Sequence, residues 1–327
     1  MSKLKISRLH SGGLITNYYC SSHCGHCLYK CSANREKHYI SKAKATEVFK
    51  KIRSLGCYSV HIGGGEPMLN IPQLLEVAAA ANEAGMGIDY VETNSSWFQT
   101  GDKAIDVLNE CLRHGIRQLL VSISPFHNEY IPFYKVKGVL QACRKTGMSV
   151  FPWVMDFYSD IDAFDDQICH PLSEYQERFG PDYLRNIPQR YWTHLGGRAI
   201  STFREVFPSI PADLIFDSPP CIELSDTGHF HIDLFGNYIP GLCTGLAIDM
   251  DDLGSEPGPD KYPILTRLYT RGIGALHSYA SERYGFKPKP DYLNKCDLCN
   301  DIRRFLVINC KIKSAELKPL SYYTDID

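Results

Sequence analysis

The feature that most constrains this chain is a cysteine cluster near its amino end, Cys20-Ser-Ser-His-Cys24-Gly-His-Cys27. Three thiolates in so short a run can hold an iron–sulfur cluster, a zinc ion or a partner thiol. A four-iron cluster needs one ligand per iron, so three cysteines leave one iron open to a substrate. A zinc site would instead be completed by one of three neighbours: His23, His26 or Cys31.

A second motif, Gly63-Gly64-Gly65-Glu66-Pro67, directly follows the short apolar stretch Val60-His61-Ile62, which predicts a strand. Glycine lets the backbone of such a turn approach a ligand closely because it has no Cβ. The spacing lacks the G-x-G-x-x-G pattern of dinucleotide-binding proteins. Taken alone, the stretch is also consistent with a simple tight turn, in which Glu66 only shapes the backbone before Pro67.

Together, in this order, the two motifs resemble the radical S-adenosylmethionine (radical SAM) superfamily. In that family three cysteines hold a [4Fe–4S] cluster, an aromatic residue usually precedes the third, and the glycine turn binds the amino group of SAM. His26 stands at the aromatic position here. The resemblance implies that the catalytic metal ligands are Cys20, Cys24 and Cys27. It implies SAM contacts from Gly64, Gly65, Glu66 and Pro67.

Helical and strand periodicities alternate between residues 41 and 155, and the strands recur roughly every 30 residues. This pattern predicts right-handed βαβ units around a parallel sheet, an α/β fold. Helices are expected over 41–56, 72–85, 105–115 and 136–147, and strands over 58–62, 88–91, 118–124 and 149–155. The resemblance implies that these units form a partial (β/α)6 TIM-type barrel.

Polar residues follow two of these strands, where functional groups of parallel α/β folds gather. Asn94 matches a T-N-G-type element of the family, although Ser95 replaces the glycine. The resemblance implies SAM contacts from Asn94 and from Ser122 or Ser124, which the sequence does not separate. All three are equally consistent with ordinary hydrogen bonding at strand ends.

The run Leu195-Gly196-Gly197-Arg198-Ala199 resembles a G-R-A element that many family members carry on the sixth strand. The resemblance makes Arg198 a candidate cofactor-binding residue. The alternative is an arginine that pairs with a surface carboxylate.

Four further cysteines flank a predicted hairpin, His229–Phe235 and Tyr238–Pro240, with Gly236-Asn237 as a two-residue turn. Cys221 precedes the hairpin and Cys243 follows it, and a helical segment over 264–284 leads to a C-x2-C pair. The set resembles the twitch extension of some radical SAM enzymes, a truncated relative of the SPASM domain. The resemblance implies a second, auxiliary [4Fe–4S] cluster on Cys221, Cys243, Cys296 and Cys299. Four thiolates at these spacings suit zinc equally well.

These patterns predict two domains. Residues 1–207 form the barrel, and residues 208–327 form a small α+β auxiliary cluster domain that contains the hairpin. Residues 158–190 interrupt the βα rhythm with many Asp, Pro and Tyr residues. We expect this stretch to be an insertion or a lid over the barrel mouth.

Composition narrows the set of partners. Lys and Arg number 35 against 37 Asp and Glu, so the net charge is −2 and no basic stripe attracts nucleic acid. No apolar run approaches the ~18 residues of a membrane helix, and the start lacks a signal-peptide pattern. We therefore expect a cytoplasmic protein that binds neither membrane nor nucleic acid, in a compartment where clustered cysteines usually mean metal or redox chemistry.

The resemblance implies an oxidoreductase-type enzyme that reductively cleaves SAM to a 5′-deoxyadenosyl radical, which takes hydrogen from a substrate carbon. It also implies a flavodoxin- or ferredoxin-type electron donor. The layout is similar to peptide-modifying members, so epimerisation, oxidation or crosslinking of a ribosomal peptide is expected, although no second cysteine adjoins Cys243 as hydrogen donor. The alternatives are small-molecule oxidation or dehydrogenation, aminocarboxypropyl transfer, and a non-catalytic Fe–S or zinc protein.

Overall fold

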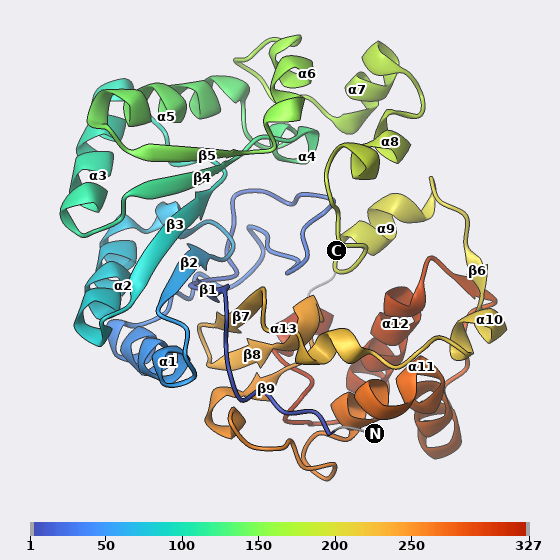
Figure 1. Ribbon diagram of the computed structural model, residues 1–327. Coiled ribbons are helices and arrows are strands. Elements are labelled where there is room, and N and C mark those ends of the chain that lie inside the picture. The colour runs from blue at the N-terminus through green and yellow to red at the C-terminus, as the bar shows by residue number, and fades with distance from the viewer. Residues whose placement is uncertain (1–2, 325–327) are drawn as a thin grey trace.

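A computed structural model describes residues 3–324, so the outer ends of both predicted domains, residues 1–2 and 325–327, lie outside the described range. A mixed sheet in the order β5-β4-β3-β2-β1-β7-β8-β9 organises the molecule (Figure 1). The strands from β5 through β7 in this order run parallel, and β8 and β9 continue the sheet antiparallel. The sheet is open, which confirms the α/β partial barrel.

The barrel half contains the βα units that the periodicity predicts. Its strands are β1 (Gly12–Ile15), β2 (Ser59–Gly63), β3 (Gly87–Thr93), β4 (Gln118–Ser122) and β5 (Ser149–Trp153). Its main helices are α1 (Lys42–Ser54), α2 (Ile71–Ala84), α3 (Gly101–Arg113) and α5 (Phe133–Thr146). Each predicted helix and strand over 41–155 is confirmed, with ends shifted by a few residues.

Local chemistry sets the ends of these helices. The side chain of Ser41 accepts from the Lys44 amide at the start of α1, and Asn70 does the same for Gln73 at the start of α2. Gly85 and Gly147 end α2 and α5 with φ of 69° and 74°, a left-handed conformation that favours glycine. These caps explain why the boundaries are readable from the sequence.

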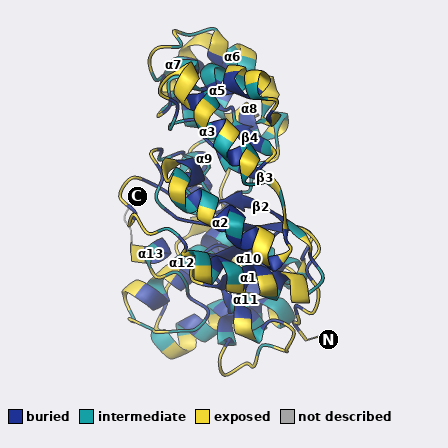
Figure 2. Cartoon of the chain, turned by 90° about the vertical axis from the view of Figure 1, so that its left-hand side faces the viewer, coloured by how far each residue is buried: buried dark blue, intermediate teal, exposed yellow. Residues whose placement is uncertain are grey.

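The apolar stripe of each helix covers the outer face of the sheet, and Figure 2 shows exposed residues on the solvent side of these helices. In α2, for example, Leu74, Val77, Ala78 and Ala81 are fully buried. Successive strand residues point to opposite faces, so one set of side chains remains for the inner face. That inner face carries the site described below.

The sixth parallel strand differs from the expectation. Residues 195–198 form no strand; they make a turn that leads into α9 (Ala199–Arg204). The position beside β1 is taken instead by β7 (Phe230–Asp233), which pairs with it in parallel. The first hairpin strand thus extends the barrel sheet, because its buried residues pack on the core of the barrel.

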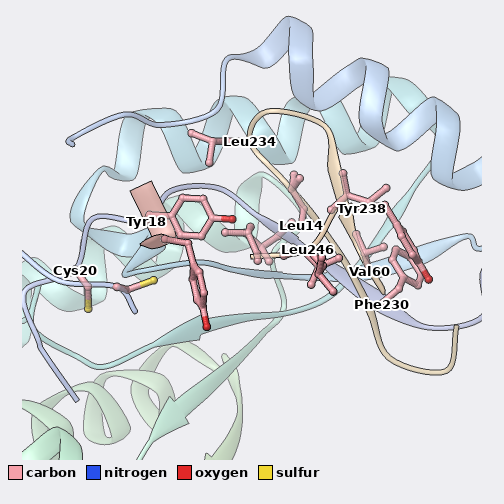
Figure 3. Packing of buried hydrophobic residues seen from close by; sticks show 14 of the residues in the cluster. Leu14, Tyr18, Cys20, Val60, Phe230, Leu234, Tyr238 and Leu246 are labelled. Carbon is pink, nitrogen blue, oxygen red and sulfur yellow. The ribbon is translucent and has the colours of Figure 1, made fainter. Parts of the chain in front are cut away.

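The predicted hairpin is present as β7 and β8 (Asn237–Ile239), but its turn is longer than expected. Leu234, Phe235 and Gly236 connect the strands, and Gly236 has φ of 84°. A three-residue connection with glycine in the left-handed position replaces the two-residue turn. In Figure 3, Leu14, Tyr18 and Val60 of the barrel share one apolar cluster with Phe230, Leu234, Tyr238 and Leu246.

The chain that follows the hairpin is mainly helical. The larger ones are α11 (Pro263–Tyr284) and α12 (Lys295–Ile308). Gly272 interrupts α11 with φ of 78°, so the predicted segment is two helices joined at a kink. The shorter elements are β6 (Ile210–Pro211), α10 (Ala212–Phe216), η3 (Ile222–Ser225), η4 (Pro240–Leu242), β9 (Ile248–Asp249), η5 (Met250–Asp252), β10 (Asp291–Tyr292) and α13 (Ser321–Thr324).

Residues 155–190 form short helices at one end of the barrel: η2 (Met155–Phe157), α6 (Tyr158–Asp162), α7 (Leu172–Phe179) and α8 (Tyr183–Arg190). They are anchored to α4 (Pro125–Asn128), since the buried Tyr175 hydroxyl donates to Asn128 at 2.6 Å. Tyr183 donates to Asp160 at 2.7 Å. The stretch is therefore helical and held against α4, and its role as an insertion or a lid stays a prediction. Across residues 3–324, no helix combines the length and apolarity that crossing a membrane requires.

Candidate active site

The three amino-terminal cysteines lie in the loop after β1 and face one cavity of about 310 Å³. The loop is fixed by backbone bonds, from the Cys20 amide to the Ser32 carbonyl at 3.1 Å and from the Cys27 amide to the Cys24 carbonyl at 3.0 Å. Cys20 and Cys24 are buried, and Cys27 is half-buried. The structure therefore brings the predicted ligand set together.

The electrostatics of these thiols favour a bound cation. Burial raises the pKa of Cys20 to about 12 and holds the pKa of Cys24 well above its ordinary range. The pKa of Cys27 is lowered to about 6, chiefly because the Cys31 thiol donates to its sulfur. Buried thiols that resist ionisation become thiolates when a metal supplies positive charge. The donor set thus fits a cluster.

A zinc site is the alternative to a cluster, and it requires a particular spacing of the sulfur atoms. In a tetrahedral zinc site, bonds of about 2.3 Å place thiolate sulfurs about 3.8 Å apart. Among the residues described, the one group of three donor atoms that all lie within 4.8 Å is a histidine group, not a cysteine group. Neither cysteine set is found in such a close arrangement within residues 3–324, so the geometry does not single out zinc at either.

The glycine turn is pressed against the cysteine loop. The Gly65 amide donates to the Asn17 carbonyl at 2.8 Å, and the Glu66 amide donates to the Tyr19 carbonyl at 3.0 Å. A Cβ added to Gly65 would lie 2.0 Å from the Tyr19 oxygen, and one added to Gly64 would lie 2.7 Å from Asn17. Gly64 and Gly65 line the cavity. Glycine is needed because the two loops approach so closely.

Glu66 joins this turn to the end of β3. Its buried carboxylate accepts from the Met68 amide at 3.0 Å, from the Thr93 hydroxyl at 2.9 Å and from the Asn94 amide. It caps the short helix η1 (Pro67–Leu69), where Pro67 is the first, buried residue. Glu66 borders the cavity, whereas Pro67 does not. Burial raises the pKa of Glu66 to about 7.

Asn94 reaches from β3 to the cysteine loop. Its amide nitrogen donates to the Cys20 sulfur at 3.4 Å and to the Ser22 hydroxyl at 3.1 Å, at the edge of the cavity. Ser95 has φ of 69°, the left-handed conformation that explains why glycine is usual at this position of the family element. Asn94 therefore contacts Cys20 as well as bordering the cavity.

The structure separates the two serines, Ser122 at the end of β4 and Ser124 beyond it. Ser122 lines the cavity. Ser124 is buried at the start of α4, where its hydroxyl pairs with His127 Nδ1 at 2.7 Å. β4 ends at Ser122, so Ser124 does not continue the strand face on which Ser122 lies; it caps α4 instead.

Arg198 lies behind the cysteine loop rather than in the cavity. Its guanidinium donates to the Cys24 carbonyl at 2.8 Å and to the Cys31 carbonyl at 3.1 Å, and its amide donates to the Cys27 carbonyl at 3.0 Å. The side chain is buried. It is therefore not an exposed surface arginine, and it fixes the loop that carries Cys24, Cys27 and Cys31.

The carboxy-terminal cysteines line a second cavity. Cys221 precedes η3, Cys243 ends η4, and Cys296 and Cys299 occupy the first turns of α12. Burial raises the pKa of Cys221 to about 12 and that of Cys296 to about 11. Arg303 and Lys295 also line this cavity and supply positive charge beside the thiols. His194 and Leu242 border both cavities, so the two cysteine sets share a wall.

Sequence reasoning missed several residues that line the first cavity. They are Tyr29, Tyr90, Glu92, Trp153, Tyr191, Trp192, His194, His229 and His231. The alternation of Tyr90 with Glu92, and of His229 with His231, was the available signal, since residues two apart on a strand share a face. The sequence does not show which strands pair, so it did not show that the faces carrying these residues border one cavity.

The fold and the site define an α/β protein with a cluster of buried and half-buried cysteines at one end of an open barrel. Residues 14–160 match the model of the Radical SAM superfamily, so this part of the chain is a radical SAM domain. Members of this family use SAM and a [4Fe–4S] cluster. No curated protein matches the sequence.

Solved structures with similarity to the chain include BtrN in complex with AdoMet and 2-DOIA, at 16% identity over 84% of this chain and 91% of that chain, with a TM-score of 0.42. Native anSMEcpe with bound AdoMet shares 12% identity over 92% and 97% of the two chains, with a TM-score of 0.45. Streptococcus suis SuiB shares 13% identity over 84% and 68%, with a TM-score of 0.35.

Proposed function

We propose that this radical SAM enzyme holds its [4Fe–4S] cluster on Cys20, Cys24 and Cys27 and takes a hydrogen atom from a carbon of a peptide substrate. The observation that carries the proposal is the meeting of these thiols with Gly64 and Gly65 on a single cavity. A cluster with three protein ligands keeps one iron for SAM. The glycine turn would present its backbone to SAM in the same cavity.

Several residues would hold SAM next to the cluster. Gly64, Gly65, Asn94 and Ser122 line the cavity and offer backbone, amide and hydroxyl groups. Glu66, Pro67, Ser124 and Arg198 act from behind, by fixing the turn, the start of α4 and the cysteine loop. When bound, the cluster and SAM supply one-electron reduction and a 5′-deoxyadenosyl radical.

The protein would shield this chemistry from water. His26 packs on Phe126 with ring centroids 4.6 Å apart, and Tyr191 lies edge-on to His26 at 6.4 Å. These rings enclose the cysteine side of the cavity. An apolar, closed wall limits side reactions of a reactive intermediate.

A peptide is the substrate that the cavity wall favours. Trp153 and Trp192 line the cavity and remain 37% and 66% exposed, and Tyr90 and Tyr191 add aromatic surface. Large amphipathic rings of this kind suit peptide side chains. Epimerisation, oxidation and crosslinking all begin with hydrogen abstraction, so the proposal stops at that step.

The second cysteine set would hold an auxiliary [4Fe–4S] cluster on Cys221, Cys243, Cys296 and Cys299. Four protein ligands leave no iron for substrate, so its role would be to pass an electron. The wall shared through His194 and Leu242 supports this role, because it makes the two cavities neighbours. A flavodoxin- or ferredoxin-type donor in the cytoplasm would supply the reducing electron.

Anaerobic reconstitution tests the proposal. The wild-type protein should bind about eight irons per chain, four for each cluster, and form 5′-deoxyadenosine from SAM with a reductant. Cys24→Ala should abolish SAM cleavage, whereas Cys299→Ala should lose about four irons and still cleave SAM without forming product. Iron binding with intact SAM would identify an electron carrier instead, and equal loss of cleavage in both variants would contradict the division of roles.

A further inference from the structure

A second set of donors lies on the inner face of the sheet, beside the same cavity. His61 on β2, His231 on β7 and His229 just before β7 present ring nitrogens that all lie within 4.8 Å of one another. His229 and His231 line the cavity that the cysteines also face. The function proposed above uses none of these histidines.

The strand register produces the cluster. Gly13 of β1 is the direct partner of His61 on one side and of His231 on the other, so the three residues form a row across three parallel strands. A Cβ on Gly13 would lie 2.2 Å from His61 Nε2. The absence of a side chain at the centre of the row is what lets the two imidazoles meet over β1.

The two rings face each other through nitrogen. His61 Nε2 and His231 Nε2 are 3.0 Å apart, and His231 Nδ1 is buried with no hydrogen-bond partner among the described residues. Tetrahedral coordination with bonds of 2.0–2.1 Å places two ligand nitrogens about 3.4 Å apart. The observed spacing is close to that value, so an ion fits between the rings with a small outward movement.

Neighbouring residues hold the imidazole rings in place, and a carboxylate beside them would offset the positive charge of a bound ion. Tyr90 stacks on His61 with centroids 5.0 Å apart and planes 5° apart, and His229 stacks on it at 5.4 Å. Glu92 Oε1 lies 3.8 Å from His61 Nε2. A Cβ on Gly63 would lie 2.6 Å from the other Glu92 oxygen, so a second glycine makes room for this carboxylate.

A further polar group points to an absent ligand. The Tyr29 hydroxyl is buried without a hydrogen-bond partner within residues 3–324, and the Tyr29 ring lies edge-on to His231 at 5.5 Å. Buried polar atoms are rarely left unsatisfied. The Tyr29 hydroxyl thus offers a hydrogen bond to a group bound at this cluster.

We propose that His61, His229 and His231 bind a divalent transition-metal ion on the cavity wall, apart from the cysteine sites. Neutral imidazoles suit zinc, iron, nickel and copper, and three protein ligands leave a coordination position for a further donor. Because His229 and His231 line the cavity, an oxygen or nitrogen of a substrate bound there would take that position. The assignment does not depend on SAM cleavage, so each can fail alone.

Zinc is the probe for the test. The reconstituted enzyme, with its iron content measured, is treated with EDTA, given one equivalent of zinc and desalted. The wild-type protein should retain about one zinc per chain. X-ray absorption at the zinc edge should show nitrogen and oxygen neighbours with imidazole scattering and no sulfur.

Substitutions locate the ion. His229→Ala removes a solvent-exposed ring and should weaken zinc binding at least tenfold, and His231→Ala should abolish it. His38→Gln, which changes an exposed histidine elsewhere, should bind zinc as the wild type does. Unchanged iron content and circular dichroism would show that each variant folds. His229→Ala remains informative if the buried His231→Ala does not fold.

Three outcomes would overturn the proposal. The first is a wild-type protein that retains no zinc after desalting. The second is sulfur in the zinc shell, which would place the ion at a cysteine site. The third is equal zinc retention by wild type and His229→Ala, which would leave the histidines as a hydrogen-bonded stack.

Discussion

The backbone amide of Cys31 donates a hydrogen bond to the sulfur of Cys27, with nitrogen and sulfur 3.3 Å apart. The Cys31 thiol also donates to Cys27, which raises the pKa of Cys31 and lowers that of Cys27. Cys31 lines the cavity with the three predicted ligands. The pair therefore poses a specific question, whether Cys31 supports a ligand or is one.

We expect Cys31 to donate hydrogen bonds to Cys27 and not to bind the fourth iron of the cluster, which is left for SAM. Cys31→Ser keeps a donor to the Cys27 sulfur and should bind iron and cleave SAM nearly as the wild type does. Cys27→Ser should lose about four irons per chain, because it removes a ligand. Iron analysis after anaerobic reconstitution measures both. Loss of the same iron from Cys31→Ser would make Cys31 a fourth ligand and refute SAM binding at that iron.

Removal of the Arg198 guanidinium should destabilise the cysteine loop. Arg198→Gln leaves the carbonyls of Cys24 and Cys31 buried without their charged donor, at an expected loss of about 2–4 kcal/mol in unfolding free energy. Arg113→Gln, at an exposed helix position, is the matched control and should change stability by less than about 0.5 kcal/mol. Anaerobic denaturant unfolding compares them. Equal stability of the two variants would contradict the role of Arg198.

Gly65 should tolerate no side chain. In Gly65→Ala the new Cβ meets the Tyr19 carbonyl, so the backbone of the turn or of the cysteine loop must move. We expect a loss of about 2–4 kcal/mol and reduced iron incorporation, because the same contact positions Cys20. Gly101→Ala is the control: no atom lies within 4 Å of its added Cβ, and it starts α3, where alanine is the better helix former. A wild-type iron content in Gly65→Ala would contradict the role of this contact in positioning Cys20.

The barrel helices and strands were predictable because their signals are local. Ser41, Gly85 and Gly147 mark helix ends through capping and positive φ, which depend on a few adjacent residues. The same holds for the cysteine run and for the glycine turn. Their contact depends on two loops that follow neighbouring parallel strands, and the order of βα units predicts that arrangement.

The histidine cluster was not predictable in this way. His61 and His231 are brought together by the pairing of β1 with both β2 and β7, strands far apart in the sequence. A single sequence carries no signal for that pairing, and family resemblance placed the sixth strand near Arg198 instead. Nor did the sequence separate Ser122 from Ser124, because it did not show that β4 ends at Ser122 and that Ser124 caps α4.

Glu316 should make stability depend on pH. Its fully buried carboxylate accepts from the amides of Ile264 and Leu265, each at 2.8 Å, in the first turn of α11. Burial raises its pKa to about 7 from an ordinary value of 4.5. Between these values the folded chain keeps a proton that the unfolded chain releases, so the stabilisation present below pH 4.5 is lost as the pH rises toward 7.

The loss over this window should approach about 3 kcal/mol, because each pKa unit corresponds to about 1.4 kcal/mol. Glu316→Gln cannot ionise and should remove this part of the slope, whereas the exposed Glu256→Gln should keep it. Anaerobic urea unfolding of the three proteins at pH 5, 6 and 7 measures the difference. A gap between wild type and Glu316→Gln that stays constant with pH would show that the two helix amides hold Glu316 ionised despite its burial.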